Sequence, residues 1–246
     1  MHKISPPATP QPLISIIIAT YNAADVLAGC LQSIISQTEK RVELVIIDGG
    51  STVGTLDMIK EYEAHISHWV SEPDKGIYDA FNKGTAIATG KWFCFLGADD
   101  RPLPGFSEMA TKLIDEDTLY YGDPASDGKM LTGPFSNYRL AKYCLNHQTL
   151  FYPAKVFQKY SYTDRYKIFA DYDLNLKVWG DASIKKQHYP ITVVWYNLTG
   201  FSAGAHDELF KQEKPLLIKK SMGWLMYLRF LYKRRKEQTK PDSNFY

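Results

Sequence analysis

The chain has 246 residues, of which 45% are apolar and 23% charged, a composition typical of a soluble globular protein with one sizeable α/β domain. The formal net charge is +2, but eight lysines and arginines lie in residues 219–240, which leaves 21 bases against 26 acids elsewhere. A mildly acidic body with a basic end argues against a broad nucleic-acid-binding surface. Cys30, Cys94 and Cys144 are too far apart for a zinc site, so we expect reduced, buried thiols of a cytosolic protein.

The first half of the chain alternates between predicted strands and helices. LISIIIAT, residues 13–20, is a short β-branched apolar run of the kind that forms a strand buried on both faces. Apolar residues within 26–35 recur at helical spacing. By the same criteria we expect further strands at 42–50, 67–71, 91–100 and 118–123 and helices at 23–37, 54–65, 76–88 and 104–116. This alternation predicts a doubly wound, mostly parallel α/β sheet.

The second half is less regular and richer in Gly, Tyr, Pro and Asn. We expect a helix at 169–180 and a strand at 187–197. Residues 1–12 lack an apolar signal core and predict a disordered lead-in, and no apolar run reaches the roughly 18 residues of a membrane span. The expected organisation is one domain over 13–215, with halves at 13–125 and 126–215, followed by an amphipathic basic tail over 216–246.

Three polar clusters follow predicted strands of the sheet. They are ATYN at 19–22, DGGST at 48–52 and GADD at 97–100. Ligands of an open parallel sheet bind beyond the carboxyl ends of its strands, so these clusters are expected to meet at one edge. Their convergence predicts a ligand site more strongly than any one of them alone.

The carboxylates in these clusters suggest particular ligands. Asp99 and Asp100 are hard oxygen donors that suit Mg²⁺ or Mn²⁺ bridging to a diphosphate, although an Asp-rich turn before a helix would look the same. Asp48 would accept hydrogen bonds from a base imide or a ribose hydroxyl, or simply cap a turn. The chain has no Gly-x-Gly-x-x-Gly after its first strand, no Walker lysine loop and no Gly-x-Ser-x-Gly elbow.

Four segments together resemble family 2 glycosyltransferases. They are ISIIIATYNAADVLAGCLQSIISQ, ELVIIDGGSTVGT, EPDKGIYDAFNKGTAIATG and KWFCFLGADD, and NHQTLFY, FADYDLNLK and GFSA resemble the family more loosely. The resemblance covers about half of the chain, over 13–125, and implies a GT-A fold with a nucleotide-sugar half there and an acceptor half at 126–215. It implies a donor that is a nucleoside diphosphate sugar, most commonly UDP-linked, and Mn²⁺ or Mg²⁺ as cofactor.

The resemblance also assigns roles to individual residues. Donor-binding positions would be Thr20, Tyr21, Asn22, Asp48, Ser51, Asp74, Lys75, Gly76, Tyr78, Asp79, Asn82, Lys83 and Ala98. For Asn82 and Lys83 the alternative is a solvated helix face. The Asp-x-Asp metal motif of the family falls on residues 97–99, where Gly97 replaces the first aspartate, so Asp99 would carry most of the metal contact with Asp100 beside it.

Acceptor-side roles follow from the second half. Asp171 matches the aspartate of the Glu-Asp catalytic segment, with Ala170 in place of the glutamate, and would be the general base of an inverting displacement. His147 and Gln148 would face the acceptor. Gly200, Ser202 and His206 would form a loop near the diphosphate, with His206 as a further metal ligand.

The basic tail has two interpretations. Residues 219–240 mix Trp, Tyr, Leu and Phe with bases, so they would lie in the interface of an anionic membrane, or would form a C-terminal helix with a solvated basic end. Membrane contact would fit a peripheral protein on the inner face of the cell membrane and a lipid-linked glycan acceptor in bacterial polysaccharide biosynthesis. No nucleic acid is expected as partner.

Two other functions stay open. A nucleotidyltransferase also uses an α/β sheet and a metal, but it would need a phosphate loop rich in Gly, Arg and Lys that ATYNAADV does not supply. A non-catalytic nucleotide-sugar binder or scaffold protein would explain the missing aspartate at Gly97.

Overall fold

The computed structural model describes residues 11–52, 54–128, 130–198 and 207–237. Its strands are β1 (Ile14–Thr20), β2 (Val42–Asp48), β3 (His68–Ser71), β4 (Trp92–Gly97), β5 (Arg101–Pro102), β6 (Thr118–Ala125), β7 (Leu150–Pro153) and β8 (Lys185–Trp195). Its helices are α1 (Ala24–Ile35), α2 (Thr55–Glu61), α3 (Ile77–Ile87), α4 (Pro104–Ala110), α5 (Asn137–Lys142), α6 (Val156–Lys159), α7 (Ala170–Gly180) and α8 (Glu208–Glu237), with 3₁₀ turns η1 (Glu63–His65) and η2 (His147–Thr149).

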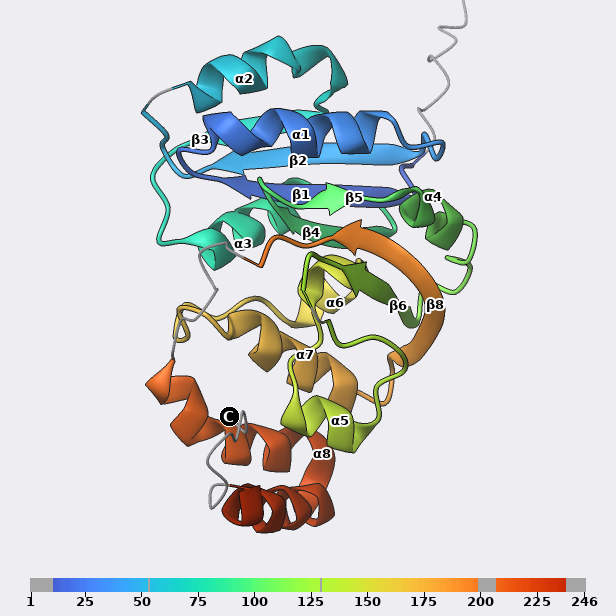
Figure 1. Ribbon diagram of the computed structural model, residues 1–246, viewed down its shortest axis with the longest axis vertical. Coiled ribbons are helices and arrows are strands. Elements are labelled where there is room, and N and C mark those ends of the chain that lie inside the picture. The colour runs from blue at the N-terminus through green and yellow to red at the C-terminus, as the bar shows by residue number, and fades with distance from the viewer. Residues whose placement is uncertain (1–10, 53, 129, 199–206, 238–246) are drawn as a thin grey trace, which may run out of the picture.

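The strands of this described part form one sheet in the order β3-β2-β1-β4-β7-β6-β8-β5 (Figure 1). β3, β2, β1 and β4 are mutually parallel, which confirms the α/β sheet expected for the first half. The register sets Thr20 beside Asp48, Asp48 beside Ser71, and Ala19 beside Gly97. The polar clusters that follow β1, β2 and β4 therefore meet at one edge of the sheet.

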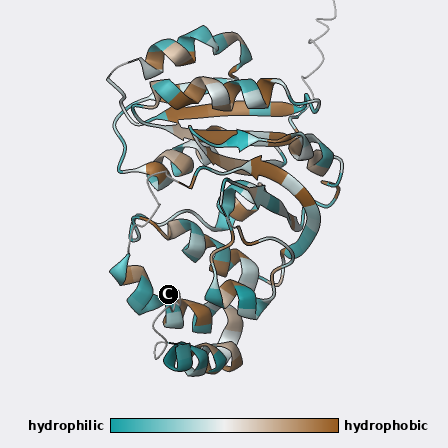
Figure 2. Ribbon diagram, in the orientation of Figure 1, coloured by the Kyte–Doolittle hydropathy of each residue, from teal (hydrophilic) through white to brown (hydrophobic). Residues whose placement is uncertain are grey.

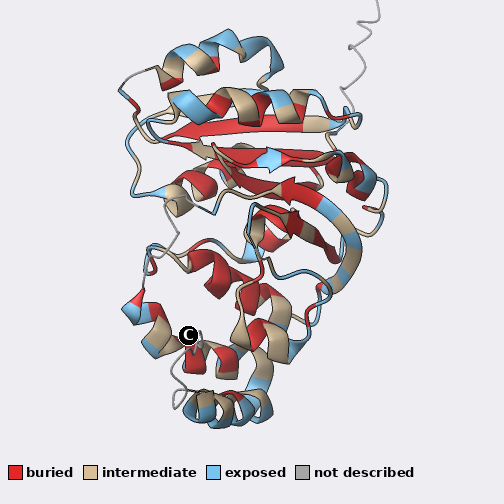
Figure 3. Ribbon diagram, viewed as in Figure 1, coloured by how far each residue is buried: buried red, intermediate tan, exposed pale blue. Residues whose placement is uncertain are grey.

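Helices cover both faces of the sheet. On one face, the Ile14, Ile16 and Ile18 side chains of β1 pack in a cluster with apolar residues of α1 and α4. On the other face, Ile17 belongs to a cluster that includes residues of α3, α5, α7 and α8. The strands between these layers are largely apolar and buried (Figures 2 and 3). This explains their near-continuous β-branched and aromatic sequences.

Several expected boundaries need correction. The strand predicted at 91–100 ends at Gly97, because residues 98–99 turn, and the helix predicted at 104–116 ends at Ala110. β5 and β7 were not expected, since they have only two and four residues, and β7 runs antiparallel to both β4 and β6. Cys144 is partly exposed rather than buried, and all three cysteines are free thiols.

The expected tail is part of a longer helix. α8 begins at Glu208 and contains a kink at Gly223, whose φ of 79° is a conformation that glycine adopts without strain. Phe210, Ile218 and Phe230 are fully buried in the cluster that also contains α7, so both segments of α8 pack on the domain. Within the described ranges, the structure contains no helix with the length and apolar character needed to cross a membrane.

Candidate active site

The centre of the sheet edge is the Asp48 carboxylate at the end of β2. It is fully buried and accepts hydrogen bonds from the hydroxyls of Thr20 (2.9 Å), Ser51 (2.5 Å) and Ser71 (2.7 Å) and from the backbone N–H groups of Gly50 (3.1 Å) and Ser51 (2.8 Å). Burial alone would raise its pKa, but the hydrogen bonds from Ser51, Ser71 and Thr20 bring the pKa of Asp48 below its usual value. Asp48 thus ties β1, β3 and the 48–51 turn together. Its direct contact with a base stays a prediction.

Replacement of Asp48 by asparagine is expected to destabilise the fold by about 3 kcal/mol at pH 7, because an amide cannot accept from all five donors. A carboxylate whose folded pKa is lowered stabilises the fold above its unfolded pKa of roughly 4 and loses that contribution as pH falls through the folded value. Urea unfolding of both proteins at pH 7 and pH 3.5 measures this. If wild type and Asp48→Asn differ in free energy of unfolding by the same amount at pH 7 and pH 3.5, the prediction is contradicted.

Tyr21 and Asn22 lie just beyond β1. The Asn22 side-chain oxygen accepts from the backbone N–H of Thr52 (3.1 Å), and the backbone N–H of Asn22 donates to the Ser51 hydroxyl (2.8 Å). Asn22 has a positive φ of 48°, which asparagine tolerates better than most residues. The Tyr21 side chain is 66% exposed, so it offers an open aromatic ring beside the Asp48 turn.

The Asp74 carboxylate lies against Gly49. A Cβ atom at position 49 would be only 2.6 Å from Asp74 Oδ2, so the glycine leaves room for this carboxylate. Asp74 Oδ1 accepts from the backbone N–H of Gly76 at 2.8 Å, which fixes the turn before α3. The segment before α3 therefore reaches the same edge as Asp48, as expected for a donor-binding segment.

The remaining predicted donor residues on α3 make contacts within the protein. The Asn82 amide exchanges two hydrogen bonds with the backbone of Tyr162 (2.8 and 3.0 Å). Lys83 contacts Glu72 at 2.8 Å and Asp79 at 3.6 Å. Asn82 and Asp79 line an open groove toward α6 and α7 together with Lys75, separate from the cavity at Asp99. For Asn82 and Lys83, both the donor-binding role and the alternative of a solvated helix face stay predictions.

The carboxylates of Asp99 and Asp100 converge above Gly97. Asp99 is half-buried and accepts from the Asn197 side chain at 2.8 Å. Asp100 is buried and accepts from the Gly97 N–H at 2.8 Å, and burial raises its pKa to about 6. A Cβ at position 97 would lie 2.9 Å from Asp99 Oδ1 and 3.3 Å from Asp100 Oδ2. The acids therefore crowd the space that a side chain at 97 would need.

This donor set fits a hard divalent cation. Two carboxylates that crowd one position supply oxygen ligands, and the phosphates of a nucleotide would complete the coordination of Mg²⁺ or Mn²⁺. Across the described ranges, no three His, Cys, Asp or Glu residues are grouped closely enough to hold a metal by themselves. Gly200, Ser202 and His206, the predicted loop and further ligand, lie outside the described residues.

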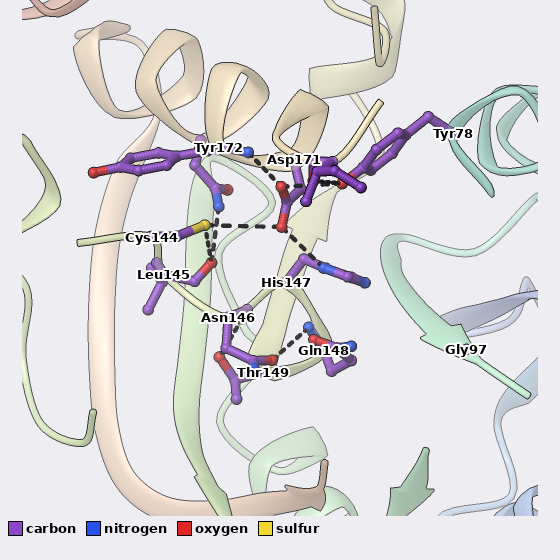
Figure 4. A network of polar contacts seen from close by, with 12 residues as sticks. Tyr78, Gly97, Cys144, Leu145, Asn146, His147, Gln148, Thr149, Asp171 and Tyr172 are labelled. Carbon is purple, nitrogen blue, oxygen red and sulfur yellow. Dashed lines mark hydrogen bonds and ion pairs between the residues drawn. The ribbon is translucent and has the colours of Figure 1, made fainter. Parts of the chain in front are cut away.

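The Asp171 carboxylate lies in the first turn of α7. It accepts from the backbone N–H of Tyr172 (2.7 Å), and it lies 3.1 Å from Nδ1 of His147 and 3.2 Å from the Tyr78 hydroxyl (Figure 4). Tyr78 also donates to the Ile168 carbonyl, and burial raises its pKa well above the usual value. Residues from α3, η2 and α7 thus form one polar network.

A cavity of ≈ 110 Å³ joins this network to the sheet edge at Asp99 and Asp100. It is lined by Ile77, Tyr78, Gly97, Asp99, Asp100, His147, Gln148, Lys167, Ile168, Tyr196 and Asn197. Gln148 and Asp100 line the same cavity. The structure therefore brings together Tyr78, Asp99, Asp100, His147 and Gln148, which the sequence had placed in three separate motifs.

The sequence analysis missed Ser71 and Asn197. Ser71 ends β3 beside Asp48. Because this strand was expected to be parallel to its neighbours, the hydroxyl at its end could have been predicted to lie at the same edge of the sheet. Asn197 follows β8, which lies far from Asp99 in the chain, so no local pattern indicated its contact with that carboxylate.

Comparison with known proteins gives one family. The family model described as Glycosyl transferase family 2 matches residues 15–210. A PGL/p-HBAD biosynthesis glycosyltransferase of Mycobacterium tuberculosis is 35% identical over 217 residues, which cover 83% of this chain and 85% of the relative. An uncharacterized glycosyltransferase of Escherichia coli is 35% identical over 108 residues, or 43% of this chain and 31% of the relative.

Solved structures have the same fold. TarS 1–349 of S. aureus in complex with UDP-GlcNAc superposes with a TM-score of 0.74 at 16% identity, covering 91% of this chain and 72% of that one. The mannosyltransferase PcManGT of Pyrobaculum calidifontis, in complex with GDP-Man and Mn²⁺, gives a TM-score of 0.62 at 14% identity, covering 95% and 82%. These likenesses confirm the GT-A fold.

Proposed function

Because this chain belongs to glycosyl transferase family 2, we propose that it moves a sugar from a nucleoside diphosphate sugar, with a UDP-sugar favoured, to a hydroxyl acceptor with inversion at the anomeric carbon. The observation that carries this proposal is the single cavity that Asp99, Asp100 and His147 line, with Asp171 hydrogen-bonded to His147. A direct displacement needs a site for the leaving diphosphate and a base for the acceptor hydroxyl within reach of one another, and residues suited to both roles line this cavity.

The donor would bind along the carboxyl edge of the sheet. The exposed Tyr21 ring offers a stacking surface for the base, beside the turn that Asp48 and Asn22 hold. Asp74 adds a carboxylate that can accept from a base imide or a ribose hydroxyl. TarS, a structural neighbour, is solved with UDP and with UDP-GlcNAc, which supports the choice of a UDP-sugar as first test donor.

Asp99 would hold the divalent cation, with Asp100 beside it. A bound Mn²⁺ or Mg²⁺ supplies positive charge that stabilises the diphosphate as it leaves. The acceptor hydroxyl loses its proton to the basic centre formed by Asp171 and His147, and its oxygen attacks the anomeric carbon from the face opposite the diphosphate. A single displacement of this kind inverts that carbon.

The acceptor is proposed to be a lipid-linked glycan at an anionic membrane surface. Trp224, Leu225, Leu228 and Tyr232 of the second α8 segment are 55–87% exposed, and Leu225, Leu228 and Tyr232 follow i, i+3, i+7 spacing on one face. Exposed bases such as Arg235 lie on the same segment. Aromatic and apolar side chains beside bases suit the interface of an anionic membrane, which would place the protein on the inner face of the cell membrane.

The function is tested by UDP release from UDP-sugars with Mn²⁺, with and without a panel of polyprenyl-diphosphate sugars. Wild-type protein is expected to release UDP faster when a suitable acceptor is present. Asp171→Asn is expected to lower kcat by about 10²–10⁴-fold, because the amide cannot support proton removal. Its affinity for UDP should be unchanged, since Asp171 does not line the cavity where the diphosphate would bind.

The same assay separates the alternatives. Tight Mn²⁺-dependent UDP binding by a wild-type protein that transfers no sugar with any donor and acceptor of the panel would favour a non-catalytic nucleotide-sugar binder. Release of pyrophosphate from a nucleoside triphosphate would favour a nucleotidyltransferase. Either result would overturn the proposed transfer reaction.

A further inference from the structure

One ring nitrogen of His147 has a hydrogen-bonding partner and the other has none among the described residues. Nδ1 lies 3.1 Å from Asp171 Oδ2. Nε2 is shielded from solvent and has no hydrogen-bonding partner among the residues that the structure describes. A buried polar atom left unpaired costs about 1–3 kcal/mol. An atom of this kind in a cavity therefore indicates a partner that binds there.

Both oxygens of the Asp171 carboxylate, in contrast, have contacts within the protein. Oδ1 accepts from the Tyr172 N–H at 2.7 Å and lies 3.2 Å from the Tyr78 hydroxyl. Oδ2 contacts His147 Nδ1 and, at 3.8 Å, the Cys144 thiol. The His147 and Asp171 side chains are equally shielded from solvent, at 12% and 11% exposed. The difference between them is that both carboxylate oxygens have protein partners, whereas Nε2 of His147 has none among the described residues.

The imidazole lies between Asp171 and the metal-binding edge. Figure 4 shows its ring extending from the Asp171 carboxylate toward the end of β4 at Gly97. His147 lines the cavity together with Gly97 and Asp99, whereas Asp171 does not. A diphosphate bound at Asp99 would therefore share its cavity with His147 and not with Asp171.

The local structure holds the ring in this position. His147 begins η2, and the Asn146 side chain caps that turn by accepting from the Gln148 N–H at 3.1 Å. The ring packs edge-on against Phe81 with centroids 5.8 Å apart. The turn, the aromatic contact and Asp171 together leave the Nε2 edge as the side that faces the cavity.

We propose that Nε2 of His147 removes the acceptor proton and that Asp171 is a positioning residue that fixes the Nδ1–H tautomer and stabilises the imidazolium. The O–H bond of the acceptor breaks as an N–H bond forms at Nε2. The acceptor oxygen bonds to the anomeric carbon, and the bond from that carbon to the diphosphate breaks with its electron pair on the nucleoside diphosphate. The imidazolium then releases its proton to water. This inference rests on the proposed transfer reaction and names the atom that takes the proton.

Transfer kinetics of His147→Gln and His147→Ala test the proposal. Both variants are expected to lose about 10²–10⁴-fold in kcat with donor KM unchanged, and added imidazole should restore part of the rate of His147→Ala. His188→Gln is the matched control, because His188 forms a similar buried pair with Asp123 at 3.0 Å but lies outside the cavity. It should keep the wild-type rate.

Two results would overturn the proposal. If His147→Gln keeps more than a tenth of the wild-type kcat while Asp171→Asn loses it, the carboxylate is the base. If calorimetry shows that His147→Gln loses Mn²⁺-dependent UDP binding, Nε2 is a metal ligand instead. A folded variant is verified by circular dichroism in each case.

A measurement without donor or metal keeps this inference separable from the proposed function. ¹⁵N spectra of histidine-labelled protein, recorded at a pH where the His147 ring carries one proton, should show that proton on Nδ1, and Asp171→Asn should shift the ring toward the other tautomer. A wild-type His147 protonated on Nε2 would contradict the assignment, because that nitrogen could not accept a proton. Absence of transfer by wild-type protein would instead contradict the proposed function and leave the tautomer result intact.

Discussion

Replacing Asp99 with alanine is expected to abolish the part of UDP binding that depends on Mn²⁺. Asp99 is the half-buried carboxylate above Gly97, whereas Asp100 is buried and accepts a hydrogen bond from the Gly97 N–H. Position 97 has no side chain to replace the lost oxygen. Calorimetry should show wild-type affinity for UDP rising at least 10-fold on addition of Mn²⁺, and Asp99→Ala showing no such rise.

Asp100→Asn is the matched control for this prediction. Its amide oxygen can still accept from the Gly97 N–H, so the turn at 97–100 should keep its geometry. We expect it to retain most of the Mn²⁺ effect, because Asp99 is unchanged and remains half-exposed. An Asp99→Ala protein whose UDP affinity still rises with Mn²⁺ as in wild type would show that the cation binds elsewhere.

The first half of the fold was predictable because its signals are local. Each of β1, β2 and β4 is largely apolar, and the polar cluster at its carboxyl end marks the edge of the sheet where ligands are expected. Parallel pairing then places Asp48 beside Thr20 without further information. The second half depends on pairing between distant segments. β7 has only four residues and is defined by its antiparallel neighbours β4 and β6, which no local pattern reveals.

In the candidate site, too, the sequence indicated individual residues but not the contacts between them. Residue types and the family resemblance indicated Asp99, Asp171 and His147 one at a time. That His147 contacts Asp171 follows only from the packing of η2 against α7, since the two residues are 24 positions apart and belong to different motifs. The partners of Asn82 could not be inferred either, because Tyr162 is 80 positions away. The residue types therefore suggested the chemistry, and tertiary packing determined which of these side chains contact one another.

The structure also determines how membrane contact can be tested. Phe230 is fully buried in the domain core, so deletion of the second α8 segment would expose that core and could release the protein by unfolding it. Substitutions on the exposed face avoid this problem. Leu225 is 87% exposed and Leu228 is 55% exposed, so glutamate at both positions should leave packing intact.

The double variant Leu225→Glu/Leu228→Glu is expected to bind anionic vesicles at least 100-fold more weakly than wild type. Inserting a leucine side chain is worth about 1.5–3 kcal/mol, and each glutamate adds repulsion from anionic headgroups. Co-sedimentation with vesicles of phosphatidylserine and phosphatidylcholine measures this. Ile114→Glu is the matched control, because Ile114 is similarly exposed at 82% but lies in the loop after α4, outside α8.

Charge and apolar contact make separate contributions to this binding. Arg235→Gln/Lys236→Gln should weaken binding to anionic vesicles by about 2 kcal/mol, since each base near the surface contributes about 1 kcal/mol, and the loss should shrink at high salt. The glutamate variant should stay weak at high salt, because its lost apolar contact is not screened. If both variants and wild type co-sediment equally, this face of α8 does not contact the membrane, and the acceptor must reach the cavity at His147 by another route.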